Sequence, residues 1–100
     1  MEDLRWSYLE LSFVCNADKY AANLRKHGVD LMIASTAFGD PCGITFGDLT
    51  HSEDEERDVL IGNSNTDVLL FIVYTLRGQT IRLISARKCK AHEVKIYAEQ

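Results

Sequence analysis

The chain has 100 residues, of which 46% are hydrophobic and 26% are charged, a balance typical of one folded globular domain. This composition excludes a disordered, collagen-like or coiled-coil protein as the main state. The formal net charge of −4 argues at first against a nucleic-acid partner, but it is unevenly distributed. Residues 1–76 have a net charge of −8, whereas residues 77–100 have six basic residues against two acidic ones, a net charge of +4.

The compartment expected for this protein is the cytoplasm, without membrane association. The acidic start Met1-Glu2-Asp3 does not fit a signal peptide, and the longest apolar run, residues 68–74, is too short to cross a bilayer. Three cysteines without a Cys-x-x-Cys pair indicate reduced thiols. The histidines lack metal-ligand spacing and no phosphate-binding glycine loop is present, so neither a metal nor a cofactor is expected.

The N-terminal part of the chain predicts a strand followed by a helix. Residues 9–13 alternate apolar and polar side chains, the pattern of a half-buried strand. Asn16 can cap a helix over residues 17–27, and Gly28 can end that helix in the left-handed conformation. The residues expected on its buried face, one turn apart, are Tyr20 and Leu24.

A second short helix is predicted to begin after Asp30 and to end at residues 39–41. Its apolar positions follow helical spacing and are Leu31, Ala34 and Phe38. Residues 44–46 then predict a short strand, and residues 47–56 a polar loop.

The rest of the chain predicts three more strands and a final helix, at residues 57–62, 68–75, 80–86 and 88–98. Residues 68–74 are apolar without alternation, which favours a central strand covered on both faces. The whole pattern indicates an α+β fold in which a small antiparallel sheet packs with helices, in a single domain over residues 1–100.

An acidic loop at residues 51–56 precedes Arg57. His51 could act as a general acid or base near neutral pH, and the guanidinium of Arg57 could hold a phosphate. The alternative interpretation is a solvated loop in which Glu55 or Glu56 pairs with a neighbouring arginine.

Basic side chains gather near tyrosines in the C-terminal quarter of the chain, a combination that suits RNA phosphates and unstacked bases. The residues concerned are Arg77, Arg82, Arg87, Lys88 and Lys90, with Tyr74 and Tyr97. Arg82 stands within the apolar strand 81–84, where it must face solvent, pair with a carboxylate or meet a ligand phosphate. The alternative is an edge-strand arginine paired with the acidic loop.

The order of several short motifs resembles one known family, the BrnT toxins of bacterial type II toxin–antitoxin systems. The matching segments are Asn23-Leu24-Arg25-Lys26-His27-Gly28-Val29, Phe38-Gly39-Asp40-Pro41, residues 51–57, Ile61-Gly62, Thr75 with Arg77-Gly78, residues 81–87, and His92-Glu93 with Ile96-Tyr97. The likeness extends from about Phe13 to the C-terminus, which leaves residues 1–12 as an N-terminal extension.

The resemblance implies a RelE/ParE-like fold and a metal-independent ribonuclease that cuts RNA and inhibits translation. It also implies a hetero-oligomer with a BrnA-like ribbon-helix-helix antitoxin, through which alone the toxin would reach operator DNA. Such a nuclease needs a base for the 2′-OH, cations for the phosphorane charge and an acid for the leaving 5′-oxygen. The candidate catalytic residues are Arg57, His51, Glu56, Arg82 and Arg87, and the candidate RNA-binding residues are Arg77, Lys88, Lys90, Lys26 and Tyr97.

One position departs from the family pattern. Where the family usually shows Phe-x-Trp-Asp before the first helix, this chain has Phe13-Val14-Cys15-Asn16, so Cys15 replaces an aromatic residue that could stack on a base. Trp6 in the extension is a possible substitute. The alternative function is therefore a catalytically degenerate homologue that binds the antitoxin and acts as an operon co-repressor.

Overall fold

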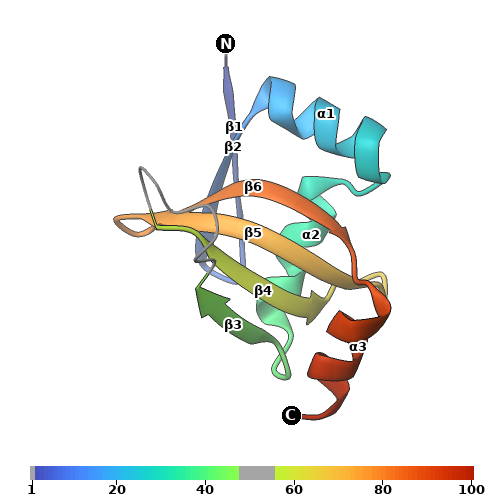
Figure 1. Ribbon diagram of the computed structural model, residues 1–100. Coiled ribbons are helices and arrows are strands. Elements are labelled where there is room, and N and C mark those ends of the chain that lie inside the picture. The colour runs from blue at the N-terminus through green and yellow to red at the C-terminus, as the bar shows by residue number, and fades with distance from the viewer. Residues whose placement is uncertain (1, 48–55) are drawn as a thin grey trace.

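A computed structural model describes residues 2–47 and 56–100. In this part of the chain a single six-stranded sheet has the strand order β1-β2-β6-β5-β4-β3, with helices against it (Figure 1). The elements are β1 (Asp3–Tyr8), β2 (Leu11–Asn16), α1 (Ala17–His27), α2 (Leu31–Ser35), the 3-10 helix η1 (Thr36–Gly39), β3 (Ile44–Gly47), β4 (Asp58–Asn63), β5 (Leu69–Arg77), β6 (Thr80–Lys88) and α3 (Ala91–Ala98). No helix in the described ranges is long and apolar enough to span a membrane.

The predicted α+β class is confirmed, with one difference in the sheet. Every pair of neighbouring strands is antiparallel except β2 and β6, which are parallel. A parallel pair needs a long connection, and α1, α2 and β3 to β5 lie between these two strands along the chain. β5 lies between β6 and β4, as expected for the central apolar run. The alternative that placed Arg82 on an edge strand is wrong, since β2 pairs with β6 on its other side.

The N-terminal segment forms a hairpin, and the prediction of one strand over residues 9–13 is wrong. Leu9 and Glu10 are the two turn residues, with φ of 50° and 66°, between β1 and β2. Two consecutive positive φ values are typical of the tight turn that suits the twist of paired strands. Neither residue is a glycine or asparagine, so the alternation in the sequence continues through the turn and hides it.

The predicted ends of α1 are confirmed. The Asn16 side chain accepts hydrogen bonds from the backbone N–H groups of Asp18 and Lys19 at 2.9 and 3.2 Å. Gly28 closes the helix with φ of 68°, a left-handed conformation that glycine adopts without a steric cost. The predicted buried face is wrong at Leu24, which is 47% exposed.

Asn23, rather than Leu24, joins α1 to the sheet. Its amide donates to the carbonyls of Val29 and Ala86 at 3.0 and 2.9 Å and accepts from the Ala86 N–H at 3.0 Å. β2 pairs with β6 only at residues 80–82, so it does not cover the backbone edge of Ala86. The buried Asn23 amide takes the place of a neighbouring strand there.

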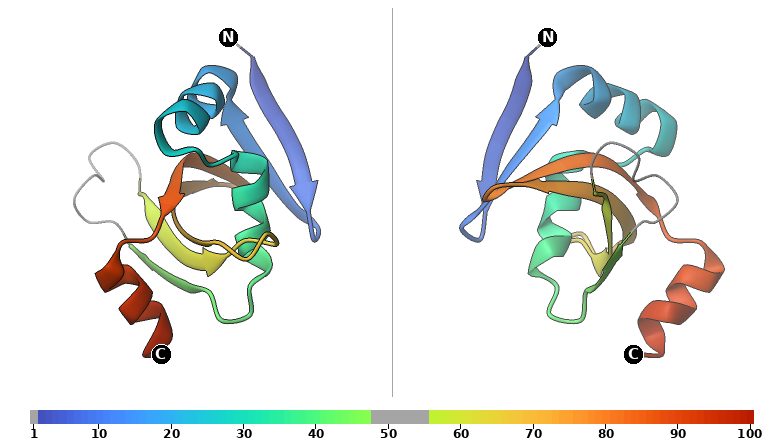
Figure 2. Two further views of the ribbon diagram at one scale, coloured as in Figure 1. Left: turned by 90° about the vertical axis from the view of Figure 1, so that its right-hand side faces the viewer. Right: turned by 60° about the vertical axis from the view of Figure 1, so that its left-hand side comes forward.

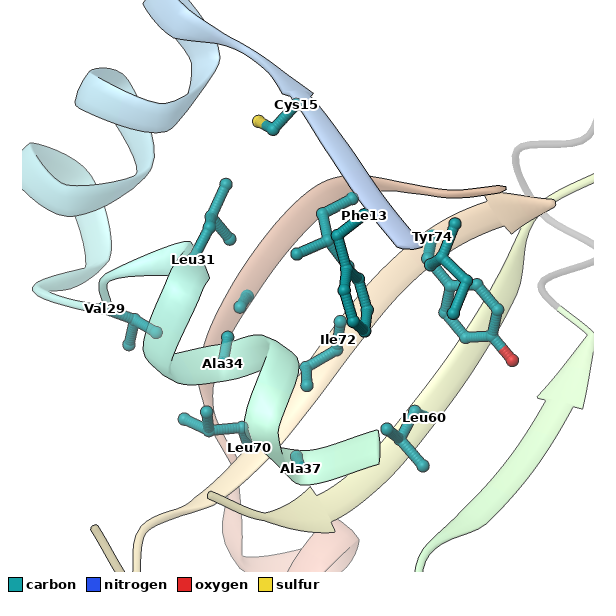
Figure 3. Close-up of a cluster of buried hydrophobic side chains, with 13 residues drawn as sticks. Phe13, Cys15, Val29, Leu31, Ala34, Ala37, Leu60, Leu70, Ile72 and Tyr74 are labelled. Atoms are coloured by element: carbon teal, nitrogen blue, oxygen red, sulfur yellow. The ribbon is translucent and has the colours of Figure 1, made fainter. Parts of the chain in front are cut away.

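The main core lies between one face of the sheet and the α2–η1 segment (Figure 3). Its side chains alternate along the strands with those of the opposite face, as the two-residue period of a strand requires. The largest fully buried members are Phe13, Leu31, Leu70, Ile72 and Leu83. The rings of Phe13 and Phe38, and of Phe38 and Tyr74, meet edge to face at 5.3 and 5.1 Å.

Cys15 belongs to this core, where its side chain is fully buried (Figure 3). Burial raises the pKa of its thiol. A base cannot reach this buried side chain, so Cys15 does not take over the stacking role suggested for the family's aromatic residue. Trp6 does not supply a platform either: it stacks on Phe13 at 5.8 Å and donates to Ser35 Oγ at 2.9 Å.

The hairpin and α3 lie at opposite ends of the molecule (Figure 2). α3 begins at Ala91, three residues later than predicted, because β6 continues to Lys88. Polar contacts hold this helix: Tyr97 donates to Asp40 Oδ2 at 2.7 Å, and Arg87 pairs with Glu93.

Candidate functional site

A polar cavity of about 380 Å³ opens where α1 meets the ends of the central strands. This cavity, called the arginine or cationic cavity below, is lined by Asn16, Lys19, Arg57, Arg77, Arg82, Leu83 and Ile84. Four of these side chains are cationic, and the lining residues that the structure describes include no carboxylate. Such a concentration of positive charge favours a polyanionic ligand.

Strand pairing explains why three arginines far apart in the sequence meet. Arg82 in β6 lies opposite Thr75 in β5, and Arg77 at the end of β5 lies opposite Thr80. Arg57 directly precedes β4, whose first residue, Asp58, lies opposite Tyr74. The two neighbours of β5, which are β4 and β6, therefore bring Arg57 and Arg82 to the end of β5 where Arg77 lies.

A buried hydroxyl fixes the segment that carries Arg57. Thr75 is 2% exposed, and its Oγ1 donates to the carbonyl of Glu56 at 2.7 Å. Thr75 also lies opposite Arg82, so it connects the segment that carries Arg57 with the strand that carries Arg82.

Replacing Thr75 with valine is expected to lower kcat/KM for RNA cleavage about ten- to a hundredfold, because small displacements of a charged group reduce its effect on the reaction. The loss of one hydrogen bond should lower the free energy of unfolding by only about 1 kcal/mol. Thr75→Ser should restore cleavage, and Thr45→Val on the exposed strand β3 serves as the matched control. Full activity of a folded Thr75→Val protein would contradict this role.

Arg82 makes an ion pair with Asp3 of the N-terminal hairpin. Its Nη2 lies 3.1 Å from Oδ2 of Asp3 in β1, and the two side chains are 21% and 33% exposed. The sequence suggested a partner in the acidic loop, of which only Glu56 is among the described residues, and did not point to Asp3. Nε of Arg82 is buried and has no hydrogen-bond partner among the described residues.

A second, shallower groove of about 250 Å³ continues from the cavity along α1 and β6. The two share Lys19 and Ile84, and the groove adds Lys26 and His27. Lys19 and Lys26 are seven residues apart, which is about two turns or 10 Å along a helix. The predicted RNA-binding residue Lys26 therefore lies in line with the arginine cavity.

Of the two candidate acids or bases, the structure describes Glu56 but not His51. Glu56 is exposed and directly precedes Arg57, which lines the arginine cavity. His51 lies outside the described residues. The choice between these two groups stays a prediction.

Arg87 does not line the arginine cavity. Its Nη1 and Nη2 each lie 2.8 Å from an oxygen of Glu93, and its guanidinium lies 4.3 Å from the centroid of the Phe71 ring. The Glu93 hydrogen bonds raise the pKa of Arg87, and the same bonds hold the pKa of Glu93 below its usual range. This geometry indicates that Arg87 fixes α3 to the sheet.

Three further candidates also lie outside this cavity. Lys88 borders an apolar pocket formed with Leu24, Ile33 and Val68, and Lys90 is the N-cap of α3. The Tyr97 hydroxyl donates to Asp40, which raises the pKa of Tyr97 to about 12. Their positions do not bring them together with Arg57, Arg77 and Arg82.

Sequence reasoning missed Lys19 and Asn16 as lining residues. The only signal for Lys19 was its place three residues after the N-cap, on the first turn of a helix. Within the described residues, no group of three His, Cys, Asp or Glu side chains could hold a metal ion. What the site offers chemically is a set of fixed hydrogen-bond donors for phosphate oxygens.

Comparison with known proteins gives one family and one fold. No curated protein matches the chain by sequence. A similar solved structure is the 1.1 Å crystal structure of the Brucella abortus ribonuclease toxin BrnT, with a TM-score of 0.59, 20% identity, and 76% of this chain and 92% of that chain covered. At this identity the likeness concerns the fold. The sequence model of the ribonuclease toxin BrnT of type II toxin–antitoxin systems matches residues 16–93, and the chain therefore belongs to the BrnT family.

Proposed function

We propose that this BrnT-family protein is a metal-independent endoribonuclease that cuts RNA in the cytoplasm and thereby inhibits translation. The observation that carries the proposal is the convergence of Lys19, Arg57, Arg77 and Arg82 on one cavity. RNA is the polyanion that fits the family's activity, and fixed cations at a phosphate stabilise the charge that develops during its transfer.

The chemistry begins with the attack of a ribose 2′-OH on the adjacent phosphorus. A base takes the hydroxyl proton, the P–O5′ bond breaks, and an acid protonates the leaving 5′-oxygen. Arg57 and Arg82 hold the non-bridging phosphate oxygens, whose negative charge increases in the transition state. Glu56 or His51 moves the proton. The products are a 2′,3′-cyclic phosphate and a 5′-hydroxyl.

The groove along α1 supports a single-stranded substrate. A strand that places its scissile phosphate in the arginine cavity would continue past Lys19 toward Lys26, where the next phosphates meet positive charge. The exposed rings near this path are few in the described residues, so binding rests chiefly on charge and should depend strongly on salt.

The antitoxin is proposed to be a BrnA-like ribbon-helix-helix protein. A toxin of a type II system implies a protein antitoxin partner. An acidic segment of that partner, laid over the cationic cavity, would both bind the toxin and block the RNA site, in a hetero-oligomer that reaches operator DNA through the antitoxin. The fold is proposed to be RelE-like, on the basis of its helices packed on the antiparallel strands β3 to β6.

The alternative function is a catalytically degenerate homologue that binds the antitoxin and acts as an operon co-repressor. Its motive is Cys15 in place of an aromatic residue, and Cys15 is fully buried in the core of this chain. Cys15 is not among the residues that line the cationic cavity. The cleavage assay below distinguishes the two functions.

The test is cleavage of a defined single-stranded RNA by the purified protein in excess EDTA. We expect fragments that end in a 2′,3′-cyclic phosphate and a 5′-hydroxyl, identified by mass spectrometry. Cleavage that requires an added divalent ion, or that leaves a 5′-phosphate, would contradict the proposed chemistry. An absence of cleavage together with tight antitoxin binding would favour the degenerate homologue.

A further inference from the structure

The N-terminal hairpin brings one carboxylate to the face of the sheet that carries the cavity. Val14 in β2 lies opposite Arg5 in β1 on one side and opposite Arg82 in β6 on the other. Residues directly opposite share a face, and so do residues two apart along a strand. Asp3, two residues before Arg5, therefore lies on the same face as Arg82, with Asn16 of the cavity as its direct neighbour in β2.

The contact between the two side chains uses only half of the binding edge of the guanidinium. Nε and Nη2 of an arginine point from the same edge and together can grip two oxygens of one carboxylate or phosphate. Asp3 Oδ2 lies 3.1 Å from Nη2 of Arg82, whereas Nε has no acceptor among the described residues. Asp3 thus occupies, through a single hydrogen bond, the edge that an RNA phosphate would take with two.

The arrangement differs from an ordinary surface ion pair in its surroundings. Arg82 lines a cavity with three other cations, so it repels them whenever no anion is bound. A nearby carboxylate relieves that repulsion while the site is empty. Because both partners are partly exposed, the pair is weak enough for a phosphate to displace.

We propose that Asp3 competes with the RNA phosphate for Arg82 and thereby lowers the affinity of the cavity for RNA. This proposal rests on the proposed function, in that RNA is the ligand. Asp3 lies outside residues 16–93, the range that the family model matches. The competition makes Asp3 a residue that tunes substrate affinity without contacting the substrate.

The experiment measures binding of a fluorescent 2′-O-methyl RNA decamer, which lacks the attacking hydroxyl and cannot be cut. Asp3→Asn keeps the shape of the side chain and removes its charge. The matched control is Glu10→Gln, the same change of charge at the turn of the same hairpin. Arg82→Ala and the double variant complete a thermodynamic cycle, and thermal unfolding verifies that each variant is folded.

We expect Asp3→Asn to lower the Kd about two- to fivefold at low salt, the range of an exposed ion pair. The plot of log Kobs against log salt should become steeper by about 0.7, the value for one additional phosphate contact on a single strand. Glu10→Gln should have a much smaller effect. In the Arg82→Ala background, Asp3→Asn should change neither quantity, because the group that Asp3 competes for is gone.

A second readout separates this inference from the proposed function. Titration with inorganic pyrophosphate, followed at the Arg82 Nε–Hε NMR signal, should show tighter binding in Asp3→Asn whether or not RNA is the natural ligand. Tighter pyrophosphate binding in Asp3→Asn, together with no effect of Arg82→Ala on RNA binding, would show that Asp3 competes with a phosphate ligand for Arg82 but that this ligand is not RNA. That result would overturn the proposed function. Unchanged or weaker binding of both probes in Asp3→Asn would overturn the competition and show that Asp3 only orients Arg82.

Discussion

Replacing Arg57 with alanine is expected to lower kcat for RNA cleavage about 10²–10³-fold, the usual effect of losing one donor that stabilises transition-state charge. Arg57 lines the cavity and sits at the start of β4, next to the proposed acid or base. It contributes no side chain to the hydrophobic core, so the fold should persist. Antitoxin binding should persist through the other three cations of the cavity, Lys19, Arg77 and Arg82. Single-turnover cleavage of a short RNA measures the effect, and co-purification with the antitoxin verifies that the partner surface is intact.

The control for this experiment is Arg25→Ala. Arg25 is exposed in the last turn of α1 and lines neither the cavity nor the adjacent groove as described. The same loss of one guanidinium there should leave kcat within about twofold of wild type, since surface changes away from a site usually have small effects. A folded Arg57→Ala protein that arrests growth as well as wild type would remove Arg57 from the site.

The second large effect is structural. Asn23→Ala should lower the free energy of unfolding by about 3 kcal/mol, because it removes three hydrogen bonds and leaves buried backbone groups of Ala86 and Val29 without partners. Alanine has the better helix propensity, so helix formation itself cannot explain a loss.

Urea unfolding followed by circular dichroism measures this change. Asn23 lines the groove beside Lys26 and also binds the backbone of β6, so the variant should also weaken the packing of α1 at the proposed RNA-binding groove. Arg25→Ala, two residues further along α1, again serves as the control and should change stability by less than about 0.5 kcal/mol. A stability of Asn23→Ala equal to wild type would show that Asn23 does not replace a strand at the edge of β6.

The elements with strong local signals could be predicted from the sequence. Asn16 and Gly28 mark the two ends of α1 because each has a backbone role that few other residues fill. The hairpin turn at Leu9 and Glu10 has no such residue, and the parallel pairing of β2 with β6 depends on contacts between distant segments. Neither could be read from local pattern.

The candidate site was predictable in part. Arg57, Arg77 and Arg82 line one cavity, whereas the C-terminal basic quarter does not form one patch, and phosphate binding by the three arginines stays a prediction. Arg82 and Arg87 lie on one strand, where five residues extend about 16 Å, so Arg82 lines the cavity whereas Arg87 lies next to α3. Glu93 then pairs with Arg87, and only the position of α3 reveals that partner. Lys19, in the acidic part of the chain, joins the site because α1 packs beside β6.

An NMR experiment on the arginine side chains with the uncleavable 2′-O-methyl RNA tests directly whether this cavity binds RNA. We expect the Nε–Hε signals of Arg57, Arg77 and Arg82 to shift on binding, and those of Arg25 and Arg87 to stay unchanged. All five signals come from one sample, so each arginine outside the cavity is an internal control. Shifts centred on Arg87, with the three cavity arginines unchanged, would contradict the claim that this cavity binds RNA.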